Sequence, residues 1–470
     1  MAMRLLQRLS DHARERGNAP ALIDAQSRET WSWRRLDAAA RSVAERLLGG
    51  LPPGAVVLLC AENEPAFVAA FLGIMRAGLK ACCVSPACPS AELQAIAAAV
   101  NAAAVIGTDA CLAAAGDGRR AIPLPLVRQA GEEGQLLSTE SLATMDQAGL
   151  LLQSSGTLGS PKIVRRSAAS LDLVSEAMCE TIGFNPSDRV LAVAPLCHSY
   201  GLEHGLLAPI WAGSCTILCR RFEVPALLGE ECQTGTIFPG VPFMFEALGQ
   251  AELRLPKLRL AYSAGGALPL ASAEAFASRF GVGVGQVYGT TEIGSVTFGD
   301  GSGGHFAPQS VGRPMRGASI EIDPENGQVC VASDWMFDGY LGEAGRAGGE
   351  AFATGDLGRI DGEGNLFLTG RLKLVVDIGG RKVNPLEVES VLAGHPEVAQ
   401  CVVIPMAMTG AVTRLKALVI PRGGAAPSPA ELRRFVKDRL AAYKVPRVFE
   451  LREQLPRSAS GKILRHLIEG

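Results

Sequence analysis

The sequence predicts an α/β protein in which helices cover largely parallel sheets. Short apolar runs typical of buried strands alternate with longer segments of helical composition, and this order repeats over much of the chain. The length of 470 residues exceeds what one hydrophobic core usually serves, so we expect two or more domains.

The alternation begins in the first quarter of the chain. Residues 56–60 form an apolar run that suits a buried strand, residues 66–77 predict a helix, and residues 81–84 predict the next strand. A helix at 90–100 and a strand at 104–106 continue the order. Further strands are expected in the middle of the chain, at 190–194, 215–219, 258–263 and 285–288.

The last hundred residues predict a smaller domain that mixes strands and helices. Strands are expected at 400–404 and 415–420, and the Gly/Ala/Pro stretch 422–427 predicts a loop. Asn384 and Ser428 should begin helices, because each is followed by proline at the first turn and by glutamate three positions on.

A domain boundary is expected near Leu372, where a strand-rich region ends and the pattern restarts. The chain would then consist of an N-terminal domain, residues 1–371, and a C-terminal domain, residues 372–470.

The composition is that of a globular protein without an obvious polyanionic partner. Hydrophobic residues make up 48% and charged residues 20%, which argues against extended disorder, and the net charge of -2 gives no reason to expect nucleic acid. The first nineteen residues lack the apolar core of a signal peptide, and no run of about 18 apolar residues predicts a spanning helix. The 12 cysteines show no CxxC spacing, so we expect reduced, mostly buried thiols in a cytoplasmic protein.

The first segment with chemistry is a loop of small residues between two expected strands. It contains Ser154, Ser155, Gly156, Thr157, Gly159 and Lys162. Glycines let backbone N–H groups approach phosphate oxygens, hydroxyls add donors, and the lysine adds positive charge. The spacing is not that of a Walker loop. An ordinary Ser/Gly linker is the alternative.

The second segment is a strand that leads into a turn, from Gln286 through Val287 and Tyr288 to Thr291 and Glu292. The aromatic face could stack on a base, the hydroxyls could contact a phosphate, and the carboxylate could hold Mg²⁺. A solvated turn at the end of a strand is the alternative.

Two further segments carry charges suited to a nucleotide. Asp356, in a Thr-Gly-Asp sequence, could accept hydrogen bonds from ribose hydroxyls, and Arg371 lies nearby in sequence. Lys462 lies in a Ser-Gly-Lys loop near the C-terminus. Taken singly, these could be loop charges or a surface lysine.

Together, and in this order, the segments resemble the superfamily of adenylate-forming enzymes. That superfamily contains acyl-CoA synthetases, nonribosomal peptide adenylation domains and luciferases, and the chain looks most similar to acyl- and aryl-CoA synthetases. The resemblance covers roughly Trp31 to Leu467. It implies a large N-terminal domain of several subdomains, with parallel-type sheets and a β-barrel-like part, and a small mobile α+β C-terminal domain.

The implied activity is ligation of an acid to a thiol in two steps. ATP and Mg²⁺ would convert a carboxylic acid into an acyl-adenylate, and the acyl group would then pass to CoA or to the phosphopantetheine of a carrier protein.

The resemblance also implies roles for single residues. The pyrophosphate end of ATP would be wrapped by the loop from Ser154 to Lys162, and Mg²⁺ would be held by Thr157 and Glu292. The adenine pocket would be lined by Gly265, Gly266, Gln286, Val287 and Tyr288. Thr291 would bind the α-phosphate, while Asp356 and Arg371 would hold the ribose. Lys373 matches the hinge position, and Lys462 matches the lysine that reaches the acyl carboxylate and α-phosphate.

The acid pocket is expected at the segments 195–202, 238–242 and 262–265. Its residues would be His198, Ser199, Phe238, Gly240, Val241, Tyr262 and Ala264. His198 resembles a gating residue, with a packed core histidine as the alternative. Domains that adenylate α-amino acids usually carry aspartate near the position of Ser199, to pair the ammonium. Because a buried ammonium without a counter-ion is costly, we expect a fatty or aromatic acid without an α-amino group.

The thiol acceptor is less defined. Gly379 and Gly380 resemble residues that flank the pantetheine tunnel, and the adjacent Arg381 and Lys382 could meet CoA phosphates, an acidic carrier protein or only solvent. Asp377 departs from the family, since many acyl-CoA synthetases have lysine there. The alternatives are a ligase that loads a carrier protein, a nucleotide-binding protein without catalysis, and a luciferase-like oxidative activity.

Overall fold

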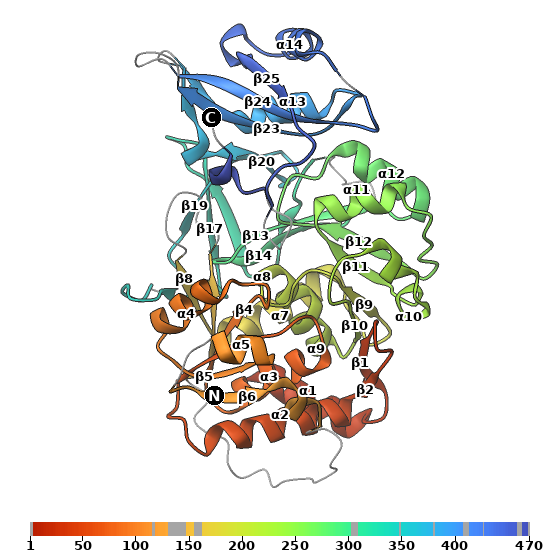
Figure 1. Cartoon of the computed structure of the whole chain (residues 1–470), viewed down its shortest axis with the longest axis vertical. Coiled ribbons are helices and arrows are strands. Elements are labelled where there is room, and N and C mark those ends of the chain that lie inside the picture. The colour runs from red at the N-terminus through yellow and green to blue at the C-terminus, as the bar shows by residue number, and fades with distance from the viewer. Residues whose placement is uncertain are drawn as a thin grey trace. The chain divides into compact units, whose positions relative to one another are not determined.

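The computed structural model describes residues 3–114, 118–129, 147–154, 162–301, 309–346, 349–378, 381–407, 413–425, 427–457 and 463–468. The chain divides into two compact units (Figure 1). The first unit contains residues 1–319 and 332–351, and the second contains residues 320–331 and 352–470. The expected boundary near residue 371 stays a prediction, since the strands just before it belong to the second compact unit.

The first unit contains a seven-stranded sheet built from the alternation predicted near the N-terminus. Its strands lie in the order β18-β8-β7-β4-β3-β5-β6. Their bounds are β3 Val56–Cys60, β4 Lys80–Val84, β5 Ala102–Gly107, β6 Arg120–Pro123, β7 Gly149–Gln153, β8 Ile163–Ser167 and β18 Gly339–Tyr340. The strands from β7 to β6 are mutually parallel, whereas β8 is antiparallel to β7 and to β18.

Helices cover this sheet and complete its parallel connections. They are α2 (Trp33–Leu48), α3 (Pro65–Arg76), α4 (Ser90–Ala99), α5 (Asp109–Ala114) and α6 (Leu124–Gln129). Every residue of α3 is buried, as its apolar sequence requires when both of its sides are covered. The helices expected at 66–77 and 90–100 are thereby confirmed to within one residue.

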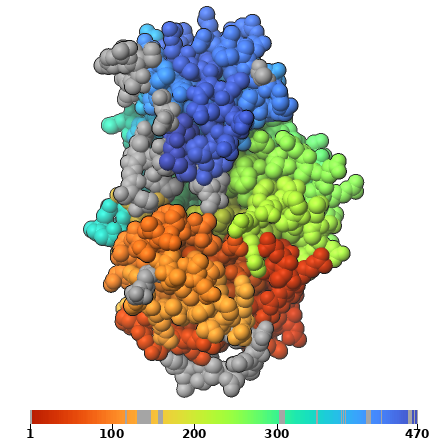
Figure 2. Space-filling view, viewed as in Figure 1, coloured from red at the N-terminus to blue at the C-terminus, as the bar shows by residue number. Residues whose placement is uncertain are grey.

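A nine-stranded sheet forms the other layer of the first unit, in the order β15-β14-β13-β12-β11-β9-β10-β1-β2. Its bounds are β1 Pro20–Asp24, β2 Thr30–Ser32, β9 Arg189–Ala192, β10 Cys215–Leu218, β11 Ile237–Gly240, β12 Leu260–Ser263, β13 Val284–Thr290, β14 Gly294–Gly299 and β15 Arg313–Pro314. All neighbours from β1 to β13 are parallel. Because β1 pairs with β10, the red N-terminal residues lie against the yellow-green ones in Figure 2.

Two helices, α11 (Pro242–Gln250) and α12 (Leu270–Phe280), pack together over β11 and β12 (Figure 1). The rings of Phe238, Phe245 and Phe276 form the centre of this packing, with centroids 5.0 to 6.4 Å apart. Opposite them runs a continuous helical segment made of α8 (Ser199–Leu202), the π-helix η2 (Glu203–Leu207) and α9 (Ala208–Ala212). The remaining long helices of this unit are α1 (Arg4–Glu15) and α7 (Ala168–Ile182).

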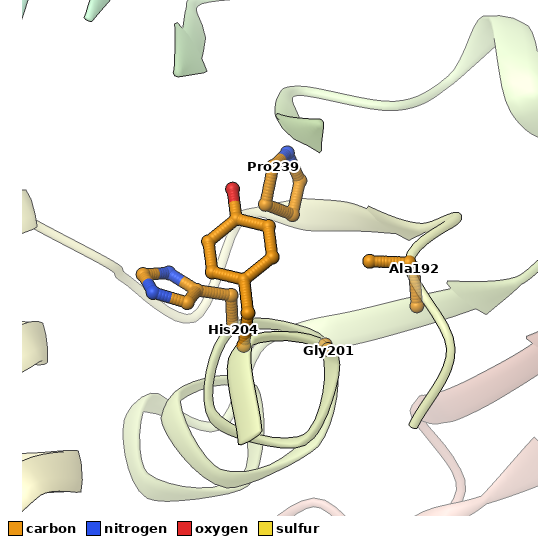
Figure 3. Close-up of a pocket in the computed structure, with 7 residues that line it drawn as sticks. Ala192, Gly201, His204 and Pro239 are labelled. Carbon is orange, nitrogen blue, oxygen red and sulfur yellow. The ribbon is translucent and has the colours of Figure 1, made fainter. Parts of the chain in front are cut away.

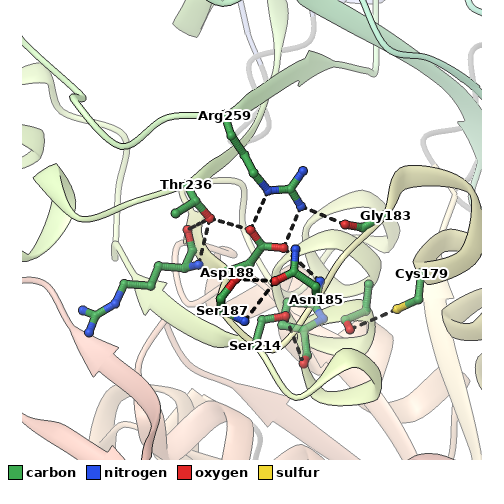
Figure 4. Close-up of polar contacts among 11 residues, drawn as sticks. Cys179, Gly183, Asn185, Ser187, Asp188, Ser214, Thr236 and Arg259 are labelled. Atoms are coloured by element: carbon green, nitrogen blue, oxygen red, sulfur yellow. Dashed lines mark hydrogen bonds and ion pairs between the residues drawn. The ribbon is translucent and has the colours of Figure 1, made fainter.

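At the amino ends of β9 and its neighbours, a buried carboxylate ties the strands together (Figure 4). Asp188 accepts two hydrogen bonds from Arg259, at 2.6 and 2.7 Å, and one from the Thr236 hydroxyl at 2.8 Å. Asn185 donates to it from its backbone N–H. Ligands of open α/β sheets bind at the carboxyl ends of strands, so this cluster has a structural role.

Among the described residues, the second unit contains three sheets, one of them the two-stranded sheet of β21 (Val376–Asp377) and β22 (Lys382–Val383). The strand-rich segment, where a barrel-like part was expected, contributes a four-stranded sheet of β16 (Ala318–Ile322), β17 (Gln328–Ser333), β19 (Phe352–Ile360) and β20 (Leu366–Arg371). The C-terminal part contributes a three-stranded sheet of β23 (Val398–Ala407), β24 (Thr413–Pro421) and β25 (Val448–Leu451). Its helices are α13 (Pro385–Ala393) and α14 (Pro429–Lys437).

Both predicted helix starts in this unit are confirmed. The Asn384 side chain accepts a hydrogen bond from the Leu386 N–H, and Ser428 forms a complete capping box with Glu431. The expectation for the cysteines also holds. All twelve cysteines are free and most are buried. None of the described helices is long and apolar enough to span a lipid bilayer.

Candidate active site

Three segments expected to bind a nucleotide and an acid lie side by side in the structure. They are the carboxyl ends of the parallel strands β11, β12 and β13, where Gly240 pairs with Ser263 and Ser263 pairs with Gln286. Crevices outside the carboxyl ends of parallel strands are where open α/β sheets bind ligands. Val287 and Tyr288 continue β13, so the expected adenine residues share this edge of the sheet.

Two buried hydroxyl groups at this edge lack a hydrogen-bond partner among the described residues. They belong to Ser263, at the end of β12, and to Thr290, at the end of β13. A buried polar group without a partner is costly, so such groups call for a bound polar ligand. Gly265 and Gly266 follow β12 and are exposed, and Gly265 has a φ of 82°, which lets the backbone turn away. The donor set therefore fits a nucleotide.

The turn after β13 carries Thr291 and Glu292, both half-buried. The Tyr340 hydroxyl donates to Glu292 Oε1 at 3.1 Å, and the Phe337 N–H donates to the Glu292 carbonyl at 2.9 Å. Among the described residues, Tyr340 is the side chain that hydrogen-bonds this carboxylate. One carboxylate with remaining lone pairs suits Mg²⁺, which usually binds one or two carboxylates together with substrate phosphates.

The small-residue loop returns to the sheet beside this turn. The flanking strands β7 and β8 are confirmed, and the Ser154 N–H donates to the Lys162 carbonyl at 2.8 Å across the base of the loop. Lys162 lies 4.3 Å from the centre of the Tyr340 ring and 2.9 Å from Glu343. Ser155, Gly156, Thr157 and Gly159 lie outside the described residues.

Tyr340 thus contacts both Lys162 and Glu292, which are far apart in the sequence. Burial, followed by the adjacent Glu292 carboxylate, raises the pKa of Tyr340, so the phenol keeps its proton and donates. No sequence pattern pointed to this residue, because β18 is a two-residue strand in a long irregular segment.

A small pocket lies next to the nucleotide edge, between the helical segment and β9 and β11 (Figure 3). It is narrow, with no free space large enough for a water molecule, and it is lined by Ala192, Ala194, Tyr200, Gly201, His204, Gly205 and Pro239. Tyr200, Gly201 and Pro239 fall in the segments expected to bind the acid, whereas His204 lies two residues beyond them.

Several residues expected in the pocket have other surroundings. The Phe238 ring packs with Phe245 and Phe276 in the core of the α11–α12 layer. Gly240, Tyr262 and Ala264 are buried, and Val241 packs partly against the same core. Neighbouring strand residues point to opposite faces, so within the expected segment 238–242 Pro239 faces the pocket while the Phe238 ring faces the core.

His198 and Ser199 begin the helical segment. His198 precedes α8, its N–H donates to the Pro195 carbonyl, and burial lowers its pKa. The Ser199 hydroxyl donates to Glu203 at 3.3 Å. Neither residue lines the narrow pocket.

His204 is fully buried, and both of its ring nitrogens are engaged. Nδ1 lies 2.8 Å from the Tyr262 hydroxyl, and Nε2 lies 2.9 Å from the Ser295 hydroxyl. Its ring centre is 4.5 Å from that of Tyr200. Burial lowers the pKa of His204 to about 3, so the ring is neutral at physiological pH.

In the second unit, the two residues expected to hold ribose form a pair. Asp356 and Arg371 face each other on β19 and β20, and Arg371 Nε donates to Asp356 Oδ1 at 2.5 Å. Both are strand residues, in contrast to the loop charges considered as an alternative. Lys373 follows in a short 3₁₀ turn, Leu372–Leu374. Gly379, Gly380 and Lys462 lie outside the described residues.

Comparison with known proteins agrees with this geometry. Residues 9–341 match the model of the AMP-binding enzyme family, and residues 387–462 match that of the AMP-binding enzyme C-terminal domain. An oxalate–CoA ligase of Arabidopsis thaliana is 29% identical over 92% of this chain and 90% of its own length.

Solved structures are similar over nearly the whole chain. The ATP-bound structure of MatB from Rhodopseudomonas palustris has a TM-score of 0.90 at 25% identity, covering 99% of this chain and 98% of its own. A benzoate CoA ligase from Burkholderia xenovorans LB400 has a TM-score of 0.87 at 27% identity, covering 98% and 99%. Since the first family model alone matches most of the sequence, the chain belongs to the AMP-binding enzymes, the AMP-forming ligases that join an acid to a thiol.

Proposed function

We propose that this chain activates a carboxylic acid without an α-amino group and transfers the acyl group to CoA. One observation carries the proposal: the unpartnered hydroxyls of Ser263 and Thr290 and the carboxylate of Glu292 lie at one sheet edge, beside a pocket without a charged lining residue. The edge offers hydrogen-bond partners to a nucleotide with its metal. The uncharged lining of the pocket suits an uncharged acyl group, and the pocket must widen to admit one.

In the first half-reaction, an oxygen of the acid carboxylate attacks the α-phosphorus of ATP. A C–O–P linkage forms, the bond to the β-phosphate breaks, and pyrophosphate leaves. Two unit charges about 4 Å apart repel by roughly 4 kcal/mol at an effective dielectric near 20, so cations must offset the approach of two anions. Lys462 and the Mg²⁺ held at Glu292 are proposed to supply that charge, and Thr291 to bind the α-phosphate.

In the second half-reaction, the CoA thiol attacks the acyl carbonyl. A C–S bond forms, the C–O bond to AMP breaks, and AMP leaves. The reaction needs no nucleophile from the protein, so no cysteine is assigned a catalytic role. Gly379 and Gly380 are proposed to flank the thiol's path, and Lys373 to serve as the hinge between half-reactions.

The remaining nucleotide contacts are proposed residue by residue. Gly265, Gly266, Gln286, Val287 and Tyr288 are proposed for the adenine, and Asp356 with Arg371 for the ribose. The pyrophosphate is assigned to the loop from Ser154 to Lys162, with Thr157 as a second group on Mg²⁺. His198 is proposed to gate the entry of ATP to the acid pocket.

The surroundings of the pocket support an acid without an α-amino group. Ser199 stands where a carboxylate would pair an ammonium, and its hydroxyl donates to Glu203. The carboxylate of Glu203 already accepts hydrogen bonds from Arg166 and Ser295. His204 is neutral with both nitrogens engaged. The α-ammonium group of an amino acid bound in this pocket would therefore lose its hydration without gaining a counter-ion.

A hydroxamate-trapping screen tests this proposal. The full chain, ATP and Mg²⁺ are incubated with fatty, benzoic, cinnamic and α-amino acids in the presence of hydroxylamine, which captures acyl-adenylates. We expect product from a benzoic, cinnamic or fatty acid and none from the amino acids. Activation of ordinary α-amino acids alone would contradict the assignment of the pocket.

The acceptor is tested with the acid that the screen selects. CoA and a phosphopantetheinylated acyl carrier protein are compared at equal concentration, and thioester formation is followed by mass spectrometry. We expect the acyl-CoA. Acylation of the carrier protein without acyl-CoA would show that the chain loads a carrier.

A further inference from the structure

A buried ion pair lies between the acid pocket and the turn that carries Glu292. Arg166 on β8 donates from Nη1 to Glu203 Oε1 on the π-helix, and each side chain is 1% exposed. Arg166 also donates from Nε to the Ser170 hydroxyl at 3.1 Å. The proposed activity assigns no role to either charge.

Glu203 also holds the start of β14. Its Oε2 accepts the Ser295 N–H at 3.0 Å and the Ser295 hydroxyl at 2.7 Å. The preceding residue, Gly294, leaves room for this contact, because a Cβ there would lie 2.9 Å from Glu203 Oε1. Ser295 is three residues after Glu292, so one carboxylate fixes the far end of the proposed magnesium turn.

The directions of the hydrogen bonds follow from the available protons. A serine hydroxyl has one proton, and Ser295 donates it to Glu203, so Ser295 Oγ must accept from His204 Nε2. His204 therefore carries its proton on Nε2 and accepts at Nδ1 from the Tyr262 hydroxyl. Burial raises the pKa of Tyr262, which keeps that phenol protonated and able to donate. Every donor in the chain from Tyr262 to Glu203 thus points towards the carboxylate.

Stability alone gives little reason to keep such a pair. Desolvating two charges costs several kcal/mol per ion, and buried ion pairs can often be replaced by apolar residues without loss of stability. Glu203 begins a π-helix, a rare element that occurs frequently at functional sites. The next two residues of the same element, His204 and Gly205, line the pocket.

We propose that Arg166 and Glu203 are positioning residues for the acid: through Ser295 they hold the His204 ring in one orientation and one tautomer as part of the pocket wall. This inference rests on the proposed function, because it assumes that the pocket binds the acid. The pair would fix the distance between the acid pocket and the Glu292 turn, since both are bonded to the same carboxylate.

The wall that this arrangement presents is uncharged and aromatic. His204 and Tyr200 offer ring surfaces, and both nitrogens of His204 are occupied, so the pocket offers no counter-ion to a charged tail. Small residues form much of the remaining lining, including Ala192, Gly201 and Gly205. Because no lining residue can neutralise a second carboxylate, an acid with an uncharged tail suits this wall better than a dicarboxylic acid.

Steady-state kinetics of acid-dependent ATP–pyrophosphate exchange test the role of the pair. The variants are Glu203→Gln, Arg166→Met and the double variant. Each single variant leaves one buried charge uncompensated, and we expect the KM for the acid to rise about tenfold or more. The KM for ATP should rise by a smaller factor, because Glu203 also holds the end of the Glu292 turn through Ser295. The double variant, which removes both charges, should recover part of the loss.

A matched control uses another buried ion pair of the same unit. Arg76 and Asp37 join α3 to α2 at 2.6 Å, with side chains 7% and 11% exposed, and they touch neither the pocket nor the Glu292 turn. Arg76→Met should lower the melting temperature but leave the KM for the acid unchanged. Loss of stability in the Glu203 and Arg166 variants, with an unchanged KM for the acid, would overturn the positioning role.

The tautomer of His204 is measured on the wild-type protein, so this experiment does not depend on the folding of a variant. The chain has 6 histidines, and ¹⁵N-histidine labelling with His204→Gln for assignment gives a tractable spectrum. We expect His204 as the neutral Nε2–H form at pH 7. A proton on Nδ1, or on both nitrogens, would overturn the inference. Absence of exchange with every acid would instead refute the proposed function, while the spectrum would still decide the tautomer.

Discussion

Tyr340 contacts two residues that are proposed to bind the nucleotide and its metal, Glu292 and Lys162. Its hydroxyl donates to Glu292, and its ring lies under Lys162. Tyr340→Phe removes the hydrogen bond and keeps the ring, so Glu292 should be less well placed for Mg²⁺. We expect the Mg²⁺ concentration for half-maximal adenylation to rise by about threefold to tenfold, since one hydrogen bond to a charged group contributes about 1.5 kcal/mol.

The Mg²⁺ dependence of pyrophosphate exchange measures this effect. Tyr340→Ala, which also removes the ring beneath Lys162, should be worse than Tyr340→Phe and should raise the KM for ATP as well. Identical Mg²⁺ dependence in wild type and Tyr340→Phe would show that the hydrogen bond does not position Glu292.

Lys462 is expected to act in one half-reaction only. Lys462→Ala should reduce adenylate formation by at least about 10²-fold, because a charge that stabilises the transition state is removed. Transfer of a preformed acyl-adenylate to CoA should continue at a rate near that of wild type. Both half-reactions are measured separately, and unimpaired adenylation in the variant would contradict the assignment.

His204 predicts a pH dependence of stability. Its pKa is about 3 in the fold and near 6.5 when unfolded, so between these values the unfolded state binds more protons. Stability is then lost as pH falls below about 6.5, by up to about 1.4 kcal/mol per pH unit from this group. The groups packed around the ring are Tyr200, Tyr262 and Ser295, with Glu203 beyond the serine.

Urea unfolding of wild type and His204→Gln at pH 5 to 8 isolates this contribution. The variant should be less stable at pH 8, and the difference between the two proteins should shrink as the pH falls. A difference in free energy of unfolding that stays constant with pH would mean that His204 titrates normally in the fold.

At the scale of elements, the positions of the strands were easier to predict than the face of the sheet on which each strand residue lies. The apolar runs at 56–60 and 215–219 became β3 and β10 almost residue for residue, because buried parallel strands are apolar on both faces. Because both faces of such a strand are apolar, the sequence does not indicate on which face a given residue lies. The segment 238–242 was expected at the pocket as a whole, and the structure separates its first two residues: Phe238 packs in the core and Pro239 lines the pocket.

The helical segment of α8, η2 and α9 shows a second limit of prediction from the sequence. The sequence indicated His198 and Ser199, which resemble a known motif, but the pocket is lined further along, at Tyr200, His204 and Gly205. A π-helix shifts the register of side chains relative to an α-helix, and no residue pattern announced η2 (Glu203–Leu207). No sequence pattern predicted contacts between residues far apart in the chain, such as that of Arg166 with Glu203.

The close approach of α8 to the end of β9 leads to another prediction. A Cβ on Gly201 would lie 2.1 Å from the Pro195 carbonyl oxygen, so Gly201→Ala must shift the helix. We expect a loss of roughly 1–3 kcal/mol of stability and a raised KM for the acid. Gly362→Ala, where a new Cβ meets nothing within 4 Å, is the control and should stay within about 0.5 kcal/mol of wild type. Wild-type stability of Gly201→Ala would contradict the packing described.

At the scale of the whole molecule, alternation of strands and helices was enough to predict the α/β class. It predicted the seven-stranded sheet and the parallel part of the nine-stranded sheet, since crossover connections are local in sequence. The division into units was harder to predict, because the segments 320–331 and 352–371 associate with the C-terminal part across an intervening stretch. Several short antiparallel strands, including β15 and β18, carried no sequence signal.

The central claim is that the carboxylate of the acid attacks the α-phosphorus of ATP. Isotope transfer tests it directly: an acid labelled with ¹⁸O in its carboxylate is turned over with ATP, Mg²⁺ and CoA, and the products are examined by mass spectrometry. Attack on the α-phosphorus should leave one ¹⁸O atom in the phosphate of AMP and none in pyrophosphate, since the bridging oxygen of the adenylate stays with AMP. Release of ADP with the label in inorganic phosphate, or AMP without the label, would contradict it.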